Sequence, residues 1–274
     1  MTEASMFEPE LAVMRRLARE ASTLVMRIYH EGFEVEMKGK NDPVTRADRE
    51  ANDLITAGLA AAFPDAGVMA EESAPSDEER VKISARPRIF FVDPVDGTRE
   101  FADKNGEFCV MIGFAVDGRA VAGVVAVPAE GRLYWGSRPS GTFVEPLEGG
   151  AATPLAATPV SDRLRAVVSR SHPSSRTRAI LDRIGVAETV PCGSVGLKVV
   201  RVLEGRADLY VHPSRGAKLW DSCAPEALLA GVGSVLTDSA GKPIDYSGPL
   251  GLEDGLIAAS PALLTRVVDA VAAG

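Results

Sequence analysis

Residues 89–98 read IFFVDPVDGT and form the central motif of the chain. Four apolar residues followed by Asp, Pro and Gly indicate a buried strand whose carboxyl end opens into a tight turn. Pro94 fixes one backbone angle and Gly97 permits an unusual one, so the turn can direct Asp93 and Asp96 to a common point. Two such carboxylates repel unless a cation lies between them, and oxygen ligands suit magnesium better than zinc. The motif therefore indicates a magnesium site, with an ordinary polar turn as the alternative.

The whole chain has the composition of an ordinary globular protein. Of its 274 residues, 46% are hydrophobic and 25% are charged, which excludes disordered and fibrous classes and allows one large domain or two smaller ones. The longest apolar run, residues 120–127, is too short to span a membrane, and the acidic amino terminus lacks the features of a secretory signal. We therefore expect a cytoplasmic protein without stable membrane insertion.

The net charge limits the classes of binding partner, and the cysteine content limits the possible cross-links and metal sites. The net charge of -8 argues against a nucleic-acid polymer, because binding a phosphate backbone needs a basic face. A small phosphorylated substrate stays open, since cations bound by carboxylates reverse the local field. Cys109, Cys192 and Cys223 are odd in number and widely spaced, which favours buried thiols over a disulfide framework or a metal pair.

Residues 1–152 are expected to form an N-terminal α+β domain. Apolar residues recur at helical spacing over residues 8–29. A second helix is expected after Thr45, which makes a capping-box-like start together with Asp48. The polar, charged residues 73–82 are expected to form a loop.

An antiparallel meander is expected to follow the central motif. Residues 109–116 and 119–127 are apolar, strand-like runs joined by Asp117-Gly118, a strong hairpin signal. Short strands at residues 133–135 and 142–144 continue the meander.

Residues 153–274 are expected to form a smaller C-terminal α/β domain, because strand-like and helical runs alternate there. The loosened composition of residues 149–154 marks the boundary. The expected strands are residues 164–169, 207–211 and 256–258 with a short piece at Val235, and the expected helices are residues 174–184, 195–203, the segment after Asp221, and 261–271.

One further carboxylate, that of Glu71, is a candidate for the same site as Asp93 and Asp96. Glu71 directly follows a short apolar piece, as Asp93 does, so two strand ends can share one site, although an acidic solvated loop is the default for this segment. Asp48 and Asp221 each stand at the start of an expected helix, and from spacing alone both are interpreted as helix-capping carboxylates.

Glu71-Glu72, residues 93–98 and Trp220-Asp221 resemble, in order and spacing, the three signature pieces of the inositol monophosphatase superfamily. The similarity spans nearly the whole chain. It implies the layered αβαβα fold of the sugar phosphatases, with an antiparallel N-terminal sheet and a smaller C-terminal α/β domain. Dimers are common in that superfamily, and the apolar meander offers a surface for a homodimer.

Shorter pieces resemble the 3'(2'),5'-bisphosphate nucleotidase branch of the superfamily: residues 41–45 (NDPVT), 105–108 (NGEF) and 169–172 (SRSH), and Gly193-Ser194 with Leu197-Lys198. The resemblance implies hydrolysis of 3'-phosphoadenosine 5'-phosphate to adenosine 5'-phosphate, with the 5'-phosphosulfate as a further candidate substrate. The alternatives are an inositol monophosphatase or a broad sugar phosphatase of the fructose 1,6-bisphosphatase kind, and, outside enzymes, a metal-binding regulatory protein of the same fold.

Carried over residue by residue, the resemblance implies two or three Mg2+ ions per site. Glu71, Asp93 and the main-chain carbonyl of Val95 would hold one ion. Asp93, Asp96 and Asp221 would hold a second, and a third, weaker ion would lie near Glu71. The superfamily also implies inhibition by lithium.

The same resemblance implies roles in catalysis. Asp48 and Thr98 would orient the attacking water, with Glu71 acting beside them through the ion it holds. The backbone N–H groups of Gly97 and Thr98 would meet a phosphate. Water would attack directly, without a phosphoenzyme.

Four residues look like contacts for the second phosphate and the nucleoside: Ser169, Arg170, His172 and Lys198. Cationic and hydroxyl groups suit that task. As an alternative, Arg170 and Lys198 are solvated surface charges, and His172 before Pro173 only shapes a loop.

Overall fold

A computed structural model describes residues 6–39, 42–171 and 174–273. The helices among these residues are α1 (Glu8–Glu31), α2 (Arg46–Ala62), α3 (Asp77–Ser84), α4 (Thr98–Ala102), α5 (Ser175–Arg183), α6 (Val195–Leu203), α7 (Leu219–Gly231) and α8 (Pro261–Ala272). None of the described helices combines the length and the hydropathy that a membrane span requires.

Two sheets carry most of the strands. The first has seven strands in the order β3-β4-β5-β6-β7-β8-β9, and the second has five in the order β11-β10-β12-β14-β13. The strands of the first sheet are β3 (Gly67–Ala70), β4 (Arg88–Asp96), β5 (Cys109–Val116), β6 (Arg119–Val127), β7 (Arg132–Ser137), β8 (Gly141–Pro146) and β9 (Thr153–Leu155). Those of the second sheet are β10 (Arg165–Ser169), β11 (Glu188–Cys192), β12 (Leu209–His212), β13 (Val235–Thr237) and β14 (Leu256–Ala259).

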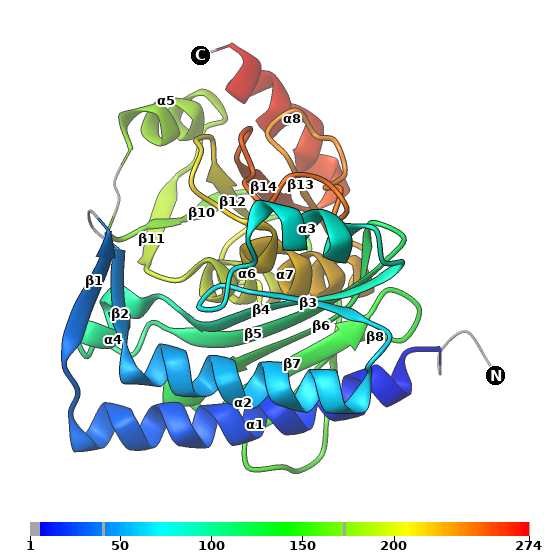
Figure 1. Cartoon of the computed structure of the whole chain (residues 1–274). Coiled ribbons are helices and arrows are strands. Elements are labelled where there is room, and N and C mark those ends of the chain that lie inside the picture. Colours follow the sequence, from blue (N-terminus) through cyan, green and yellow to red (C-terminus); the bar gives the residue numbers. More distant parts are fainter. Residues whose placement is uncertain (1–5, 40–41, 172–173, 274) are drawn as a thin grey trace.

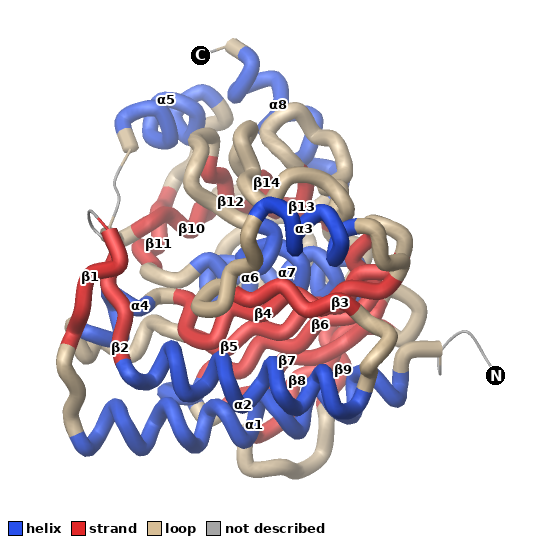
Figure 2. The backbone as a smooth tube through the Cα atoms, viewed as in Figure 1, coloured by secondary structure: helices blue, strands red, loops and turns tan. Residues whose placement is uncertain are grey.

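Helices and sheets alternate in five layers (Figures 1 and 2). Helices α1 and α2 cover one face of the first sheet, α6 and α7 lie between the two sheets, and α5 and α8 cover the outer face of the second. Apolar clusters join the layers: one lies between α1, α2 and the first sheet, one lies on both sides of α6 and α7, and one lies between the second sheet and α5 and α8, because each sheet has two faces to cover. The layered αβαβα fold that the resemblance implies is thereby confirmed.

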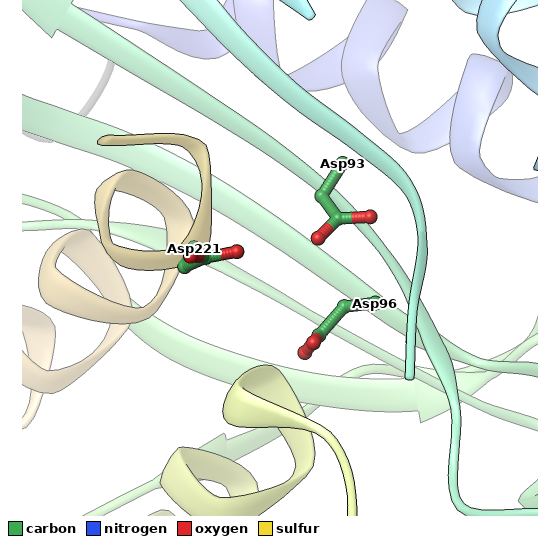
Figure 3. Close-up of side chains that lie close together, drawn as sticks. All are labelled: Asp93, Asp96 and Asp221. Atoms are coloured by element: carbon green, nitrogen blue, oxygen red, sulfur yellow. The ribbon is translucent and has the colours of Figure 1, made fainter. Parts of the chain in front are cut away.

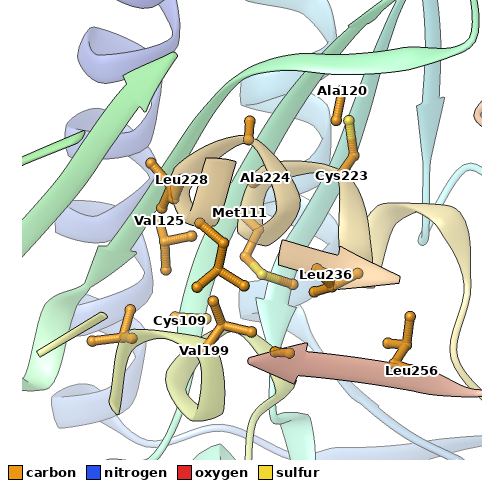
Figure 4. Close-up of a cluster of buried hydrophobic side chains, with 14 of the residues drawn as sticks. Cys109, Met111, Ala120, Val125, Val199, Cys223, Ala224, Leu228, Leu236 and Leu256 are labelled. Carbon is orange, nitrogen blue, oxygen red and sulfur yellow. The ribbon is translucent and has the colours of Figure 1, made fainter. Parts of the chain in front are cut away.

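Helices α6 and α7 of the middle layer pack against strands of both sheets. Helix α7 packs chiefly against β5 and β6 and also contacts β13 of the second sheet. Figure 4 shows Met111 and Val125 of the first sheet in one apolar cluster with Leu228 and Val199 of the helices. Residues from both halves of the chain therefore share one core, and the helix that begins near Asp221 is fixed by both sheets.

Several elements form where local sequence patterns predict them. Asp117 and Gly118 take positive φ angles of 49° and 71° and join β5 to β6 in an antiparallel hairpin. Thr45 caps α2, and the carboxylate of Asp48 bonds back to the Thr45 N–H in a capping box. The three cysteines are free and buried, as expected.

Two local expectations were wrong. Residues 73–82 are not a loop throughout, because Ser76 and Glu79 form a capping box that starts α3 within this segment. The strand at residues 89–92 does not end before the motif: β4 runs on to Asp96, with an irregular register between Asp93 and Asp96. Pro94 has no N–H to donate to the ladder, so the strand bulges there and then resumes pairing.

The first sheet extends slightly past the expected domain boundary. Strand β9 pairs antiparallel with β8, so the first sheet ends at Leu155. The division into residues 1–152 and 153–274 stays a prediction.

Candidate active site

The bulge lies at the end of β4 and carries the carboxylates of Asp93 and Asp96. Asp93 lies opposite Met111 of β5, and Asp96 lies opposite Cys109. Within the bulge, the Val95 N–H donates to Asp93 Oδ1 over 3.1 Å. The residue after Asp96 must be glycine, because Gly97 has a φ of 96° and a Cβ there would lie 2.7 Å from a backbone carbonyl.

Asp221 comes to the same point from the second half of the chain. It occupies the first turn of α7, where its Oδ2 accepts a hydrogen bond of 2.6 Å from the Lys218 N–H. Oxygens of Asp93, Asp96 and Asp221 lie within 4.8 Å of one another. Figure 3 shows the three side chains pointing into one space between β4 and the start of α7. Three buried or half-buried carboxylates thus form a group that could hold a metal ion.

Asp96 is anchored by the start of α6. Its Oδ2 accepts hydrogen bonds from the Ser194 hydroxyl and, over 2.6 Å, from the Gly196 N–H. The same Ser194 oxygen caps α6 by accepting from the Leu197 N–H. One carboxylate of the first half is therefore fixed by a helix of the second half.

The electrostatics of this group favour a cation. Burial and then the charges of neighbouring carboxylates raise the pKa of Asp93 well above its usual value, and the same causes raise the pKa of Asp221. Crowded carboxylates of this kind are stabilised by a hard cation, and all three offer oxygen ligands. The donor set therefore fits Mg2+. The Val95 carbonyl lies 3.1 Å from Thr98 Oγ1, and its role as a ligand stays a prediction.

Asp48 and Thr98 meet as the resemblance implies. The Thr98 hydroxyl lies 2.9 Å from Asp48 Oδ1, while Asp48 Oδ2 accepts hydrogen bonds from the N–H and the hydroxyl of Thr45. Burial raises the pKa of Asp48, and these hydrogen bonds oppose the rise. The helix-capping alternative and the pairing with Thr98 are both true, because the two carboxylate oxygens serve different partners.

Glu71 lies next to the carboxylate group without joining it. Its N–H bonds to the Val92 carbonyl over 3.1 Å, which places it beside the start of the bulge. Its carboxylate is held by Lys38, whose Nζ lies 3.1 Å from Glu71 Oε1 and 2.6 Å from Glu72 Oε1. The role of Glu71 as a metal ligand stays a prediction.

A cavity of about 680 Å³ opens beside Asp221 in the second half of the chain. Ser169 and Lys198 line it together with Asp221, and Tyr210 forms part of its wall. The Lys198 ammonium is buried, donates to the Gly193 carbonyl over 2.6 Å and lies 5.5 Å from the Tyr210 ring centroid. Burial lowers the pKa of Lys198, while the charge of Asp96 opposes that change. Two of the four expected substrate residues thus lie on one cavity wall.

Arg170 has another partner. Its guanidinium makes two hydrogen bonds with the Glu107 carboxylate, of 2.6 and 2.8 Å, and it is not among the residues that line the cavity. Glu107 in turn accepts from the Gly193 N–H over 2.9 Å. This bidentate pair ties the loop after β10 to the segment before β5. His172 lies outside the described residues.

Three roles were missed by reasoning from the sequence. Ser194 and Gly196 fix Asp96, and only the helix-capping signal of Ser194 before an apolar run was available to find them. The contact of Lys38 with Glu71 joins residues far apart in the sequence, and no local pattern indicates it.

The comparisons with known proteins agree with this geometry. The model of the inositol monophosphatase family matches residues 6–273. The 3'(2'),5'-bisphosphate nucleotidase CysQ of Escherichia coli (strain K12) is 36% identical over 235 residues, which cover 85% of this chain and 92% of that protein. The 3'(2'),5'-bisphosphate nucleotidase 1 of Homo sapiens is 30% identical over 264 residues, covering 84% and 83% of the two chains.

Solved structures share the fold. The extragenic suppressor protein suhB of Bartonella henselae superposes with a TM-score of 0.80 at 24% identity, covering 96% of this chain and 98% of that one. CysQ of Bacteroides thetaiotaomicron, a bacterial member of the inositol monophosphatase family, superposes with a TM-score of 0.77 at 24% identity, covering 93% and 98%. At these identities the likeness concerns the fold alone.

Proposed function

Because this chain belongs to the inositol monophosphatase family, we propose that it is a magnesium-dependent phosphomonoesterase that removes the 3'-phosphate of 3'-phosphoadenosine 5'-phosphate. One observation carries the choice of a nucleotide: Asp221 belongs both to the carboxylate group and to the wall of the 680 Å³ cavity. A cavity of that size takes a ligand much larger than a single phosphate, such as a nucleoside with a second phosphate. The named activity of the curated relatives supports the same choice.

Asp93, Asp96 and Asp221 would hold the cation, joined by Glu71 and the Val95 carbonyl. A bound divalent cation supplies positive charge toward phosphate oxygens and lowers the pKa of water. The chain's own residues do the positioning. Thr45 engages Asp48 Oδ2, which leaves Oδ1 for the Thr98 hydroxyl. The Thr98 oxygen would then accept a hydrogen bond from the attacking water.

Lys198 would meet the anionic part of the substrate that enters the cavity. Its ammonium is already fixed to a backbone carbonyl and sheltered from water, so little side-chain entropy is lost when a phosphate binds. Ser169 would donate from the same wall. Arg170 is committed to Glu107, and this favours Lys198 over Arg170 as the main cationic contact.

The test is product analysis. The purified protein, incubated with 3'-phosphoadenosine 5'-phosphate and Mg2+, should release phosphate and leave adenosine 5'-phosphate, and a chelator should stop the reaction. Formation of adenosine 3'-phosphate, or phosphate release that survives metal removal, would overturn the proposal.

A further inference from the structure

A cationic side chain already lies at the first glutamate of the candidate site. The Lys38 ammonium bridges Glu71 and Glu72 at 3.1 and 2.6 Å, and Asp42 lies 3.8 Å away. Burial of the ammonium opposes its charge, but Glu71 and Glu72 outweigh that effect and raise the pKa of Lys38 above its usual value. One ammonium therefore pairs with two carboxylates beside the Asp93 group.

Lys38 lies on the exposed strand of a two-stranded hairpin, whose other strand buries Val44 and Thr45. Strand β1 (Val35–Gly39) pairs only with β2 (Asp42–Thr45) among the described strands, and each β1 residue is exposed. Figure 1 shows this hairpin standing at the edge of the molecule, apart from both large sheets. The β1 side chains bond to other elements through Lys38, which contacts the two glutamates, and through Glu36, which pairs with Arg49 of α2. Segments with so few buried contacts open at low free-energy cost.

Glu71 stands between this hairpin and the carboxylate group. Its charge acts on Asp93, so the two carboxylates are close enough to repel. Yet one of its oxygens is engaged by Lys38, and its carboxylate lies outside the group formed by Asp93, Asp96 and Asp221. A cation that recruits Glu71 has to share it with the ammonium or displace the ammonium.

We propose that Lys38 is a positioning residue that competes with a divalent cation for Glu71, so that occupation of this part of the metal site shifts Lys38 onto Glu72 and loosens the β1–β2 hairpin. This inference rests on the metal site of the proposed function. The hairpin then reports on occupation of the site, and the metal affinity is set partly by a side chain that never binds the metal.

Charge density decides the direction of this exchange. A divalent ion brings twice the charge of an ammonium in a smaller radius, and Coulomb attraction rises with charge and falls with distance. Glu72 keeps Lys38 after the exchange, because it makes the shorter of the two contacts and its side chain is only 4% exposed. The Glu72 contact and the Glu36–Arg49 pair therefore keep β1 attached after the exchange.

Calorimetric titration with Mg2+ alone tests the competition. Lys38→Met should bind Mg2+ about tenfold more tightly than the wild type, a size typical of coupling between two ligands. Lys38→Arg keeps a cation and should bind like the wild type. Arg49→Met is the matched control, since it removes the same charge from the hairpin's other tie without touching Glu71. An equal gain in Arg49→Met, or no gain in Lys38→Met, would refute competition.

Two further measurements separate this inference from the proposed function. Asp93→Asn should weaken Mg2+ binding strongly; if it does so while Lys38→Met binds as the wild type does, the metal site stands and the competition fails. If Asp93→Asn binds Mg2+ normally, the metal site itself is wrong. In hydrogen exchange, Mg2+ should speed exchange of the β1 amides a few-fold in the wild type and leave Lys38→Met unchanged. Slower exchange in the wild type would mean that the hairpin docks on the occupied site.

Discussion

The two sides of the candidate metal site are built in opposite ways. On the inner side, Asp96 and Asp221 are fixed by backbone N–H groups and by helices packed between two sheets. On the outer side, Glu71 and Glu72 are held by one lysine from an exposed hairpin. Backbone hydrogen bonds and helix packing thus fix the inner carboxylates, whereas the outer ones are held by a single side chain from an exposed strand.

Removing one carboxylate of the inner side should abolish most of the catalytic activity. Asp93→Asn is expected to lower kcat/KM by roughly a thousandfold or more, since a catalytic metal contributes several kcal/mol and each 1.36 kcal/mol is about tenfold. The fold should survive, because an amide oxygen can still accept the Val95 N–H and a repelling charge is gone. Phosphate release and the thermal midpoint without metal measure the two effects, and hydrolysis at the wild-type rate would mean that the site is elsewhere.

Glu226 of α7 is a buried carboxylate that lies outside the group formed by Asp93, Asp96 and Asp221. Burial raises the pKa of Glu226 to about 7, although the hydrogen bond from Tyr246 and the charges of Arg138 and Arg119 oppose the rise. A folded-state pKa above the unfolded value gives stability that is complete below about pH 4.5 and is lost as the pH rises through about 7.

Glu226→Gln should therefore remove this loss. The variant should exceed the wild type in stability by up to roughly 3 kcal/mol at about pH 8 and match it in acid, as measured by urea unfolding. Glu34→Gln, at an exposed position, is the control and should change neither value. A parallel pH dependence in the wild type and Glu226→Gln would contradict the assignment.

A smaller effect separates the two cationic residues near the cavity. Lys198→Met is expected to raise KM for the nucleotide about tenfold, because one charge-assisted hydrogen bond to a phosphate is lost. Arg170→Met should change KM less than about twofold and cost at most about 1 kcal/mol of stability, since its pair with Glu107 is partly exposed. Steady-state kinetics with both variants measure the contrast, and the reverse order would place the substrate's second phosphate at Arg170.

The inner carboxylates were easier to predict from the sequence than the contacts of Glu71 and Glu72, because they depend more on residues that are close in sequence. The hairpin at Asp117-Gly118, the helix at residues 195–203 and the capping of α2 by Thr45 depend on residues close in sequence, and all three formed. Asp93 and Asp96 were found because one short motif carries both. The meeting with Asp221 was expected from the resemblance alone, since no spacing in the chain brings α7 to β4.

The missed features depend on contacts between distant segments or on weak patterns. Strand β11 (Glu188–Cys192) is polar, contains Pro191 and lies at a sheet edge, so it lacks the alternation of a buried strand. Helix α3 has no buried residue and is set by its capping box. The bond of Lys38 to Glu71 and that of Ser194 to Asp96 form only after the layers pack.

We propose that the carboxylate group and the adjoining cavity together bind a bisphosphate nucleotide for hydrolysis. The most direct test is the ratio of kcat/KM for 3'-phosphoadenosine 5'-phosphate to that for inositol 1-phosphate, measured with Mg2+ on the wild type and on Lys198→Met. A clear preference for the nucleotide that shrinks in Lys198→Met is the predicted result. A preference for inositol 1-phosphate, unchanged in Lys198→Met, would contradict it.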